Sequence, residues 1–227
     1  YERRKDSVQQ YNEAQLQRRF IDPVMEALGI EFAVEESVQK NQRRPDYGFF
    51  ASEEAVDDAF DRKAEDGDFY TNAVAVADAK YWNRSLDTQG SNDRTFENPS
   101  FQISVYLDET PAEWAVLTNG RQWRIYYAKT AHRLDSYYEI DLPVLLEACD
   151  PESENGLEPF KYFFQFFRHE AFIDDGRGQF LDRVLHESNI FAEELGEDLK
   201  ENIYEAIEVL ANGFLSYHEN DLGQDDL

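Results

Sequence analysis

Apolar residues recur at every fourth position near the start of the chain, and this spacing predicts a helix over residues 8–28. Pro23 falls inside the pattern and is expected to kink the helix or divide it in two. Gly29 is placed to end it, since glycine readily adopts the left-handed conformation that closes helices. The apolar positions that share this face are Leu16, Phe20, Val24 and Leu28.

Short apolar runs in the middle of the chain predict a β-sheet. The run Ala73–Asp78 is typical of a strand covered on both faces. Asn119 and Gly120 form a strong hairpin signal between two further strands. Residues 83–98 are polar and predict a long loop. The other expected strands are Glu31–Val38, Tyr47–Phe50, Trp114–Thr118, Gln122–Ala128 and a short one near Tyr137–Ile140, with helical segments near 100–108 and 142–149, and a helix or loop over 52–67.

The pattern changes after the polar stretch 150–156, which contains proline and glycine and predicts a linker. Beyond it the apolar spacing is helical throughout, including a phenylalanine stripe over residues 160–167. We therefore expect an α/β domain over residues 1–150, with a mixed β-sheet flanked by helices, and an α-helical segment over 151–227.

Composition supports a folded domain. Leu, Ile, Val and Phe make up about a quarter of the 227 residues, above the roughly 20% below which chains are typically disordered. No apolar run approaches the length of a membrane helix, so no membrane partner is expected. Cys149 is the only cysteine and cannot form an internal disulfide, which favours the cytoplasm. The first residue is Tyr1 and the last stretch is polar, so we expect a fragment of a longer protein.

The charge is strongly acidic, with 22 Lys and Arg against 48 Asp and Glu and a net charge of −26. The acids are spread along the whole chain and only seven residues are lysine, a distribution typical of a protein from a halophile. Taken alone, this charge argues against a nucleic-acid partner, because DNA-binding domains usually carry a basic patch.

Three polar residues at strand ends change that view. Asp78 and Lys80 lie two residues apart at the end of the strongest predicted strand, so their side chains point to the same face. If the strand after Asp46 pairs beside it, two carboxylates and one ammonium converge. A divalent cation such as Mg²⁺ relieves the repulsion between crowded carboxylates, and a nearby lysine can orient or deprotonate a metal-bound water. Such a site can hydrolyse a phosphodiester.

The segments Pro45-Asp46 and Asp78-Ala79-Lys80 resemble the motif of the PD-(D/E)-x-K nuclease superfamily. The apolar run that leads into Asp78 fits this resemblance. So do two residues one helical turn apart on the next helix, Gln102 and Tyr106, and an acid in the first helix, Glu13.

The resemblance implies a restriction-endonuclease-like fold and a role for each matching residue. Asp46 and Asp78 would be metal ligands, with Glu13 as an accessory ligand. Lys80 would position or activate the attacking water, and Gln102 would support the site. The superfamily more often has Glu where this chain has Asp78. A DNA contact is expected for Tyr106, which could instead be core, and for Arg43 and Arg44, which could instead pair with nearby acids.

The chain as a whole resembles the start of a type IIG restriction-modification enzyme. Residues 13–29 resemble the opening of its nuclease domain, 114–126 the hairpin, and 191–207 the helical connector. The resemblance implies a site-specific deoxyribonuclease that needs Mg²⁺ or Mn²⁺ and binds double-stranded DNA, with a second nuclease copy for double-strand cleavage. Methyltransferase and target-recognition domains, where S-adenosylmethionine would bind, would follow in the same chain.

Two other functions stay open. One is the nuclease domain of a type I restriction motor subunit, which has the same motif. The other is a non-catalytic DNA-binding or scaffolding module that kept the nuclease fold.

Overall fold

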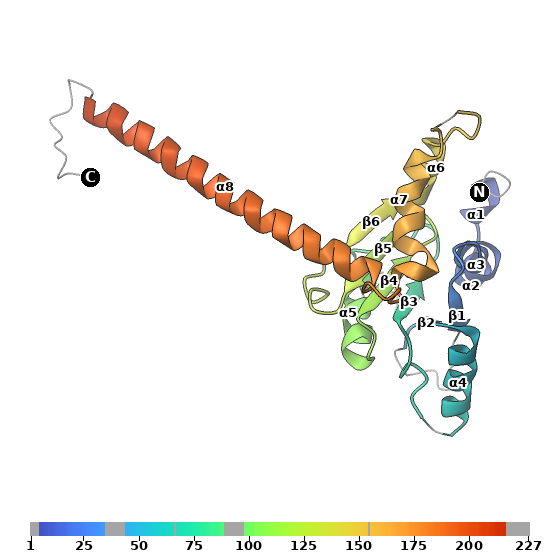
Figure 1. Ribbon diagram of the computed structural model, residues 1–227. Helices are drawn as coiled ribbons and strands as arrows, with labels where there is room; N and C mark the ends of the chain where they lie inside the picture. Colours follow the sequence, from blue (N-terminus) through green and yellow to red (C-terminus); the bar gives the residue numbers. More distant parts are fainter. Residues whose placement is uncertain (1–4, 35–43, 66, 89–97, 154, 217–227) are drawn as a thin grey trace. The chain divides into compact units, whose positions relative to one another are not determined.

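The computed structural model describes residues 5–34, 44–65, 67–88, 98–153 and 155–216. The chain divides into two compact units, Tyr1–Phe180 and Leu181–Leu227. The first unit is a mixed α/β structure whose strands form one sheet (Figure 1). The α/β class expected from the sequence is therefore confirmed.

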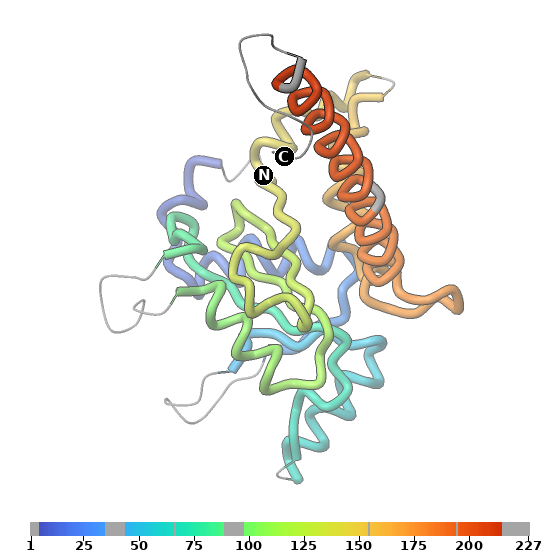
Figure 2. The backbone as a smooth tube through the Cα atoms, turned by 90° about the vertical axis from the view of Figure 1, so that its left-hand side faces the viewer, coloured from blue at the N-terminus to red at the C-terminus, as the bar shows by residue number. Residues whose placement is uncertain are grey.

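The sheet has six strands that lie side by side in the order of the sequence. Each pair of neighbours is antiparallel except β3 and β4, which are parallel and are joined by a crossover through helix α5 (Pro99–Glu109). Figure 2 shows the backbone from another side, with β2, β3 and α5 coloured from light blue to green by residue number. The strands are β1 (Glu31–Val34), β2 (Tyr47–Phe50), β3 (Ala75–Ala79), β4 (Trp114–Thr118), β5 (Gln122–Tyr127) and β6 (Tyr138–Asp141).

One face of the sheet is covered by α4 (Glu53–Ala64) and α5. The α4 helix begins where the Ser52 side chain accepts a hydrogen bond from the Ala55 backbone N–H, as an N-cap residue does. Side chains from both helices and from alternate strand positions form one apolar cluster, which includes Ala59, Val76, Ile103, Ala115 and Leu117.

The other face of the sheet packs against helix α7 (Glu158–Phe167), which follows α6 (Leu142–Glu147). The Trp123 ring of β5 meets Phe163 and Phe167 edge-on, with ring centroids 5.4 and 5.8 Å apart. These aromatic contacts keep α7 in the first compact unit. That unit therefore extends to Phe180, beyond the boundary expected at residue 150.

The amino-terminal helical region differs from the single helix expected over 8–28. It consists of α1 (Lys5–Val8), then α2 (Glu13–Leu16), a π-helical turn, Gln17–Ile21, and α3 (Asp22–Ala27). The α2 helix, the π turn and α3 follow one another without a break from residue 13 to residue 27. This helical stretch begins at residue 13 because Asn12 and Gln15 form a reciprocal capping box. Pro23 is accommodated in the first turn of α3, where its missing N–H costs little. Gly29 follows with φ of 72°, as expected for a helix end.

The described part of the second unit, from Leu181 onward, belongs to a single helix, α8 (Phe180–Ser216), 37 residues long. Its helical structure agrees with the α-helical pattern expected within residues 151–227. Several apolar side chains along it are exposed, among them Phe191, Leu195, Leu199 and Ile203. No helix in the described ranges combines the length and apolar character needed to cross a membrane.

The predicted strands agree closely with the structure. The bounds of β2 and β4 match, β3 begins two residues later than expected, and β6 begins one residue later. The first strand ends at Val34, and residues 35–38 of the predicted strand lie outside the described residues. The helices expected near 100–108 and 142–149 correspond to α5 and α6, with bounds that differ by one or two residues. A short 3-10 turn, His169–Ala171, follows α7.

A buried arginine ties the loop after β3 to the sheet. Arg124 on β5 donates two hydrogen bonds to Asp87, at 2.6 and 2.9 Å, and one to Glu139 on β6, at 2.5 Å. Its guanidinium also stacks on the Tyr137 ring, 4.0 Å from the centroid. These contacts balance the cost of burying the Arg124 charge, since only 1% of the residue is exposed.

Replacing Arg124 by alanine should lower the free energy of unfolding by about 2–3 kcal/mol, because it leaves a cavity and unpairs two acids. Arg124→Lys should recover little, because an ammonium cannot form the forked pair. Urea unfolding would measure both. Arg121→Ala is the matched control, since its pair with Asp141 is exposed and should contribute less than about 1 kcal/mol. Equal losses in Arg124→Ala and Arg121→Ala would contradict the prediction.

Candidate active site

The pairing of β2 with β3 brings the predicted acids together. Tyr47 lies opposite Ala77 in the antiparallel register, so the preceding residue, Asp46, falls opposite Asp78. Lys80 follows on the same face as Asp78, and its Nζ forms an ion pair with Asp78 Oδ2. The convergence that the sequence predicted for these three side chains is present in the structure.

Backbone contacts fix the end of β3. The N–H of Lys80 donates to the Thr118 carbonyl at 2.8 Å, so the parallel ladder continues one residue beyond the strand. The N–H of Ala79 donates in the other direction, to Asp46 Oδ2 at 2.8 Å. The motif residues therefore sit on a segment held on both sides, which limits how far their side chains can move.

Two tyrosines hold the segment around Asp46. The Tyr70 hydroxyl donates to the Pro45 carbonyl at 2.8 Å, and the Tyr47 hydroxyl donates to Asp22 Oδ1 of α3 at 2.8 Å. Burial, together with the neighbouring Asp22 charge, raises the pKa of Tyr47, so its hydroxyl stays a donor. The approach of Asp46 to β3 is thus fixed from the sheet and from the helix.

The charges of the site influence one another strongly. Burial and the nearby Asp78 charge raise the pKa of the Asp46 carboxyl to about 8, against the weaker lowering effect of Lys80. Burial disfavours the Lys80 ammonium, but the two aspartates outweigh it and raise the pKa of Lys80. The lysine is therefore a cation beside Asp78, and the ionised form of Asp46 would be favoured by any added positive charge.

Glu13, the predicted accessory ligand, borders the same cluster. The Tyr81 backbone N–H and the charges of Lys80 and Asp78 act electrostatically on its carboxylate. Burial of the carboxylate raises the pKa of Glu13, although the residue as a whole is exposed. Glu13 therefore lies at the open side of the site, where a ligand could reach it.

The other predicted site residues are Gln102, Tyr106, Arg44 and Arg43. Gln102 is half-buried on α5, the helix that packs against β3 and β4, and its role stays a prediction. Tyr106 is 5% exposed and packs in the apolar core, so its ring does not offer the surface expected for a DNA contact. Arg44 is half-buried just before the motif, and its DNA contact stays a prediction. Arg43 lies outside the described residues.

Two residues of the site were missed by the sequence reasoning. Gln17 donates from Nε2 to Asp46 Oδ2 at 3.1 Å. Arg84, which is 5% exposed, acts electrostatically on Glu13. Gln17 could have been found from its position, because it lies four residues after Glu13 and so on the same helix face. For Arg84, which lies in a loop, no periodicity points to the site.

A divalent cation fits the chemistry of this cluster. Asp46 and Asp78 crowd two carboxylates together, and Asp78 Oδ2 is a buried oxygen whose neighbour is the Lys80 ammonium. Carboxylate oxygens are the ligands that Mg²⁺ and Mn²⁺ prefer. Among the described residues, no group of three or more His, Cys, Asp and Glu side chains is already arranged to hold a metal ion. A cation would therefore have two candidate acids here, with Glu13 as a third that must approach.

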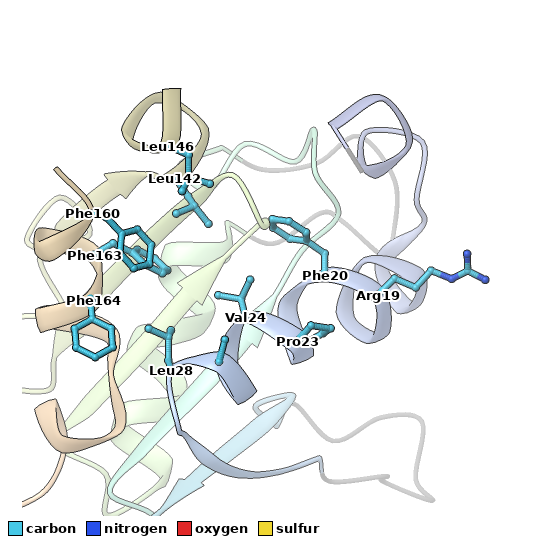
Figure 3. A pocket seen from close by; sticks show the side chains of 11 residues that line it. Arg19, Phe20, Pro23, Val24, Leu28, Leu142, Leu146, Phe160, Phe163 and Phe164 are labelled. Carbon is cyan, nitrogen blue, oxygen red and sulfur yellow. The ribbon is translucent and has the colours of Figure 1, made fainter. Parts of the chain in front are cut away.

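A separate apolar cavity of about 450 Å³ lies away from the acids. Helix residues such as Phe20, Val24 and Leu28 face Leu142 and Phe163 across it, as Figure 3 shows. None of the catalytic candidates lines it. The acidic cluster, and not this cavity, carries the groups that could perform chemistry.

Comparisons with known proteins do not extend these observations. No family model, no curated protein and no solved structure matches this chain.

The raised pKa of Asp46 predicts a measurable pH dependence. A carboxyl whose pKa is higher in the folded protein than in the unfolded chain favours folding most at low pH. That stability is lost as pH rises from about 4 towards 8. Asp46→Asn removes the buried charge but keeps an acceptor. We expect it to be more stable than the wild type at pH 8 by at least about 1 kcal/mol in EDTA, and the gain to shrink below pH 5.

Urea unfolding of both proteins across this range tests the prediction. Asp108→Asn, which removes an exposed acid on α5, is the matched control. A stability difference between Asp46→Asn and the wild type that does not change with pH would show that Asp46 is not protonated in the folded protein.

Proposed function

We propose that this chain contains a Mg²⁺-dependent DNA endonuclease domain of the PD-(D/E)-x-K superfamily, with a restriction-endonuclease-like fold. The observation that carries the proposal is the meeting of Asp46 with Asp78 and Lys80 at the ends of two paired strands. Asp46 and Asp78 are 32 positions apart in the sequence, yet they lie in one cluster with Lys80. Two aspartates and a lysine are the residue types that the motif requires.

Each side chain would have a definite task in the hydrolysis. Asp46 and Asp78 would hold Mg²⁺ or Mn²⁺, and Glu13 would complete the ligand set from the helix. The bound cation would lower the pKa of a water and stabilise the negative charge that develops on the phosphate. Lys80 would donate hydrogen bonds that hold the attacking water or a phosphate oxygen in line with the scissile bond.

From the same resemblance we also infer the kind of longer protein to which this domain would belong. The domain would act on double-stranded DNA as the amino-terminal part of a type IIG restriction-modification enzyme, with methyltransferase and target-recognition domains in the same chain. A nuclease subunit of a type I restriction motor would use an identical site. One site cuts one strand, so cleavage of both strands would need a second copy. The long helix α8 is suited to lead from the nuclease to such domains.

Plasmid nicking by the 227-residue chain in Mg²⁺ and molar KCl tests the proposal. Wild type should convert supercoiled plasmid to the open circle, and EDTA should stop the reaction. Asp78→Ala and Lys80→Ala should each lower the rate at least about 100-fold, because each removes a group that acts on the reacting atoms.

Lys161→Ala is the matched control, since this lysine is exposed on α7 and pairs with Glu158 within its own helix. Nicking that persists in both Asp78→Ala and Lys80→Ala would place the activity elsewhere and refute this site.

A further inference from the structure

Each of the two aspartates of the site contacts other groups of the protein through only one of its two carboxylate oxygens. Asp46 Oδ2 accepts from Gln17 Nε2 at 3.1 Å and from the Ala79 N–H at 2.8 Å. Asp78 Oδ2 is taken by the Lys80 ammonium. Within the described part of the chain, no hydrogen bond reaches the Oδ1 atom of either aspartate. One oxygen of each carboxylate is therefore left for a ligand.

The two donors on Asp46 are of different kinds. The Ala79 N–H belongs to the strand backbone and is fixed by the sheet, whereas the Gln17 amide arrives from the helix. The last torsion of an aspartate side chain is broad when nothing restrains it. Donors from two directions fix that torsion, so the plane of the Asp46 carboxylate and the direction of Oδ1 are set before any ligand arrives.

Gln17 is the first residue of a π-helical turn. Its carbonyl accepts from the Asp22 N–H five residues later, so the turn contains one residue more than an α-helical turn. Glu13 lies one α-helical turn before Gln17, on the same side of the helix. Ile21, the last residue of the π turn, and Met25 beyond it are buried in the core. One continuous helical segment therefore contributes to both the site and the core.

The amide is chemically suited to this position. It donates a hydrogen bond to a carboxylate and carries no charge. A lysine or arginine here would also donate, but its positive charge would oppose the binding of a cation to Asp46. Gln17 therefore orients the carboxylate without repelling the cation.

We propose that Gln17 is a positioning residue that presents Asp46 Oδ1 as a single-oxygen ligand for the divalent cation. This inference rests on the proposed metal-dependent function. Partners that orient a metal ligand in this way typically contribute 10-fold to 100-fold to metal affinity or activity.

Calorimetric titration of the 227-residue chain with Mn²⁺ tests the proposal without any need for catalysis. Gln17→Leu keeps a similar volume and loses the donor, and we expect it to bind Mn²⁺ about 10-fold more weakly. The electron paramagnetic resonance spectrum of its bound Mn²⁺ should broaden, because the ligand geometry becomes less uniform. Circular dichroism and the urea midpoint should stay close to those of the wild type.

Arg18→Ala is the matched control, since Arg18 lies on the same π turn with an exposed side chain, and Mn²⁺ affinity should not change. If Gln17→Leu does not fold, Gln17→Asn carries the same expectation, because its amide is one methylene too short. Wild-type affinity and an unaltered spectrum in the folded Gln17 variant would overturn the role of Gln17 alone. A wild-type chain that binds no Mn²⁺ would overturn the proposed function together with it.

Discussion

Two carboxylates that face each other across a pair of strands are the constraint around which much of this domain is organised. In the register of β2 and β3, Asp46 and Asp78 are brought to one small volume that is partly closed to water. Burial and the nearby Asp78 charge together raise the pKa of Asp46, and the Lys80 ammonium only partly offsets that effect. The structure retains this arrangement because the surrounding hydrogen bonds hold each group in place.

Those hydrogen bonds come from four separate segments of the first unit. Tyr70 contributes from the segment before β3, Asp22 from α3, Gln17 from the π turn, and Thr118 from β4. A cluster so firmly supported is preorganised, since little rearrangement would be needed when a cation arrives. The free energy that opposes bringing the two acids together is offset by the folding of the surrounding structure, as is common at functional sites.

The sequence predicted the parts of this arrangement that depend on local pattern. The strand Tyr47–Phe50 and the run that ends at Asp78 follow from apolar spacing, and their pairing was the natural way to join the acids. The π turn could not be predicted, because it depends on how the helix packs against the core. Gln17, by contrast, lies four residues after Glu13 and could have been found from that spacing. The place of Phe163 and Phe167 against Trp123 is a tertiary contact that no periodicity reports, so the end of the first unit was expected too early.

The π turn makes the geometry of the site depend on the number of residues in a helix as well as on their identities. If one residue were removed between Gln17 and Ile21, the Asp22 N–H could still bond the Gln17 carbonyl, now as an ordinary α-helical pair, so the residues on each side would keep their directions. A deletion between Glu13 and Gln17 has no such extra residue to absorb it and would rotate Glu13 by about 100° relative to Gln17. Every side chain of the site would still be present in that chain, but Glu13 would point elsewhere. Relatives of this chain should therefore vary in length more readily within the π turn than in the α-helical turn before it.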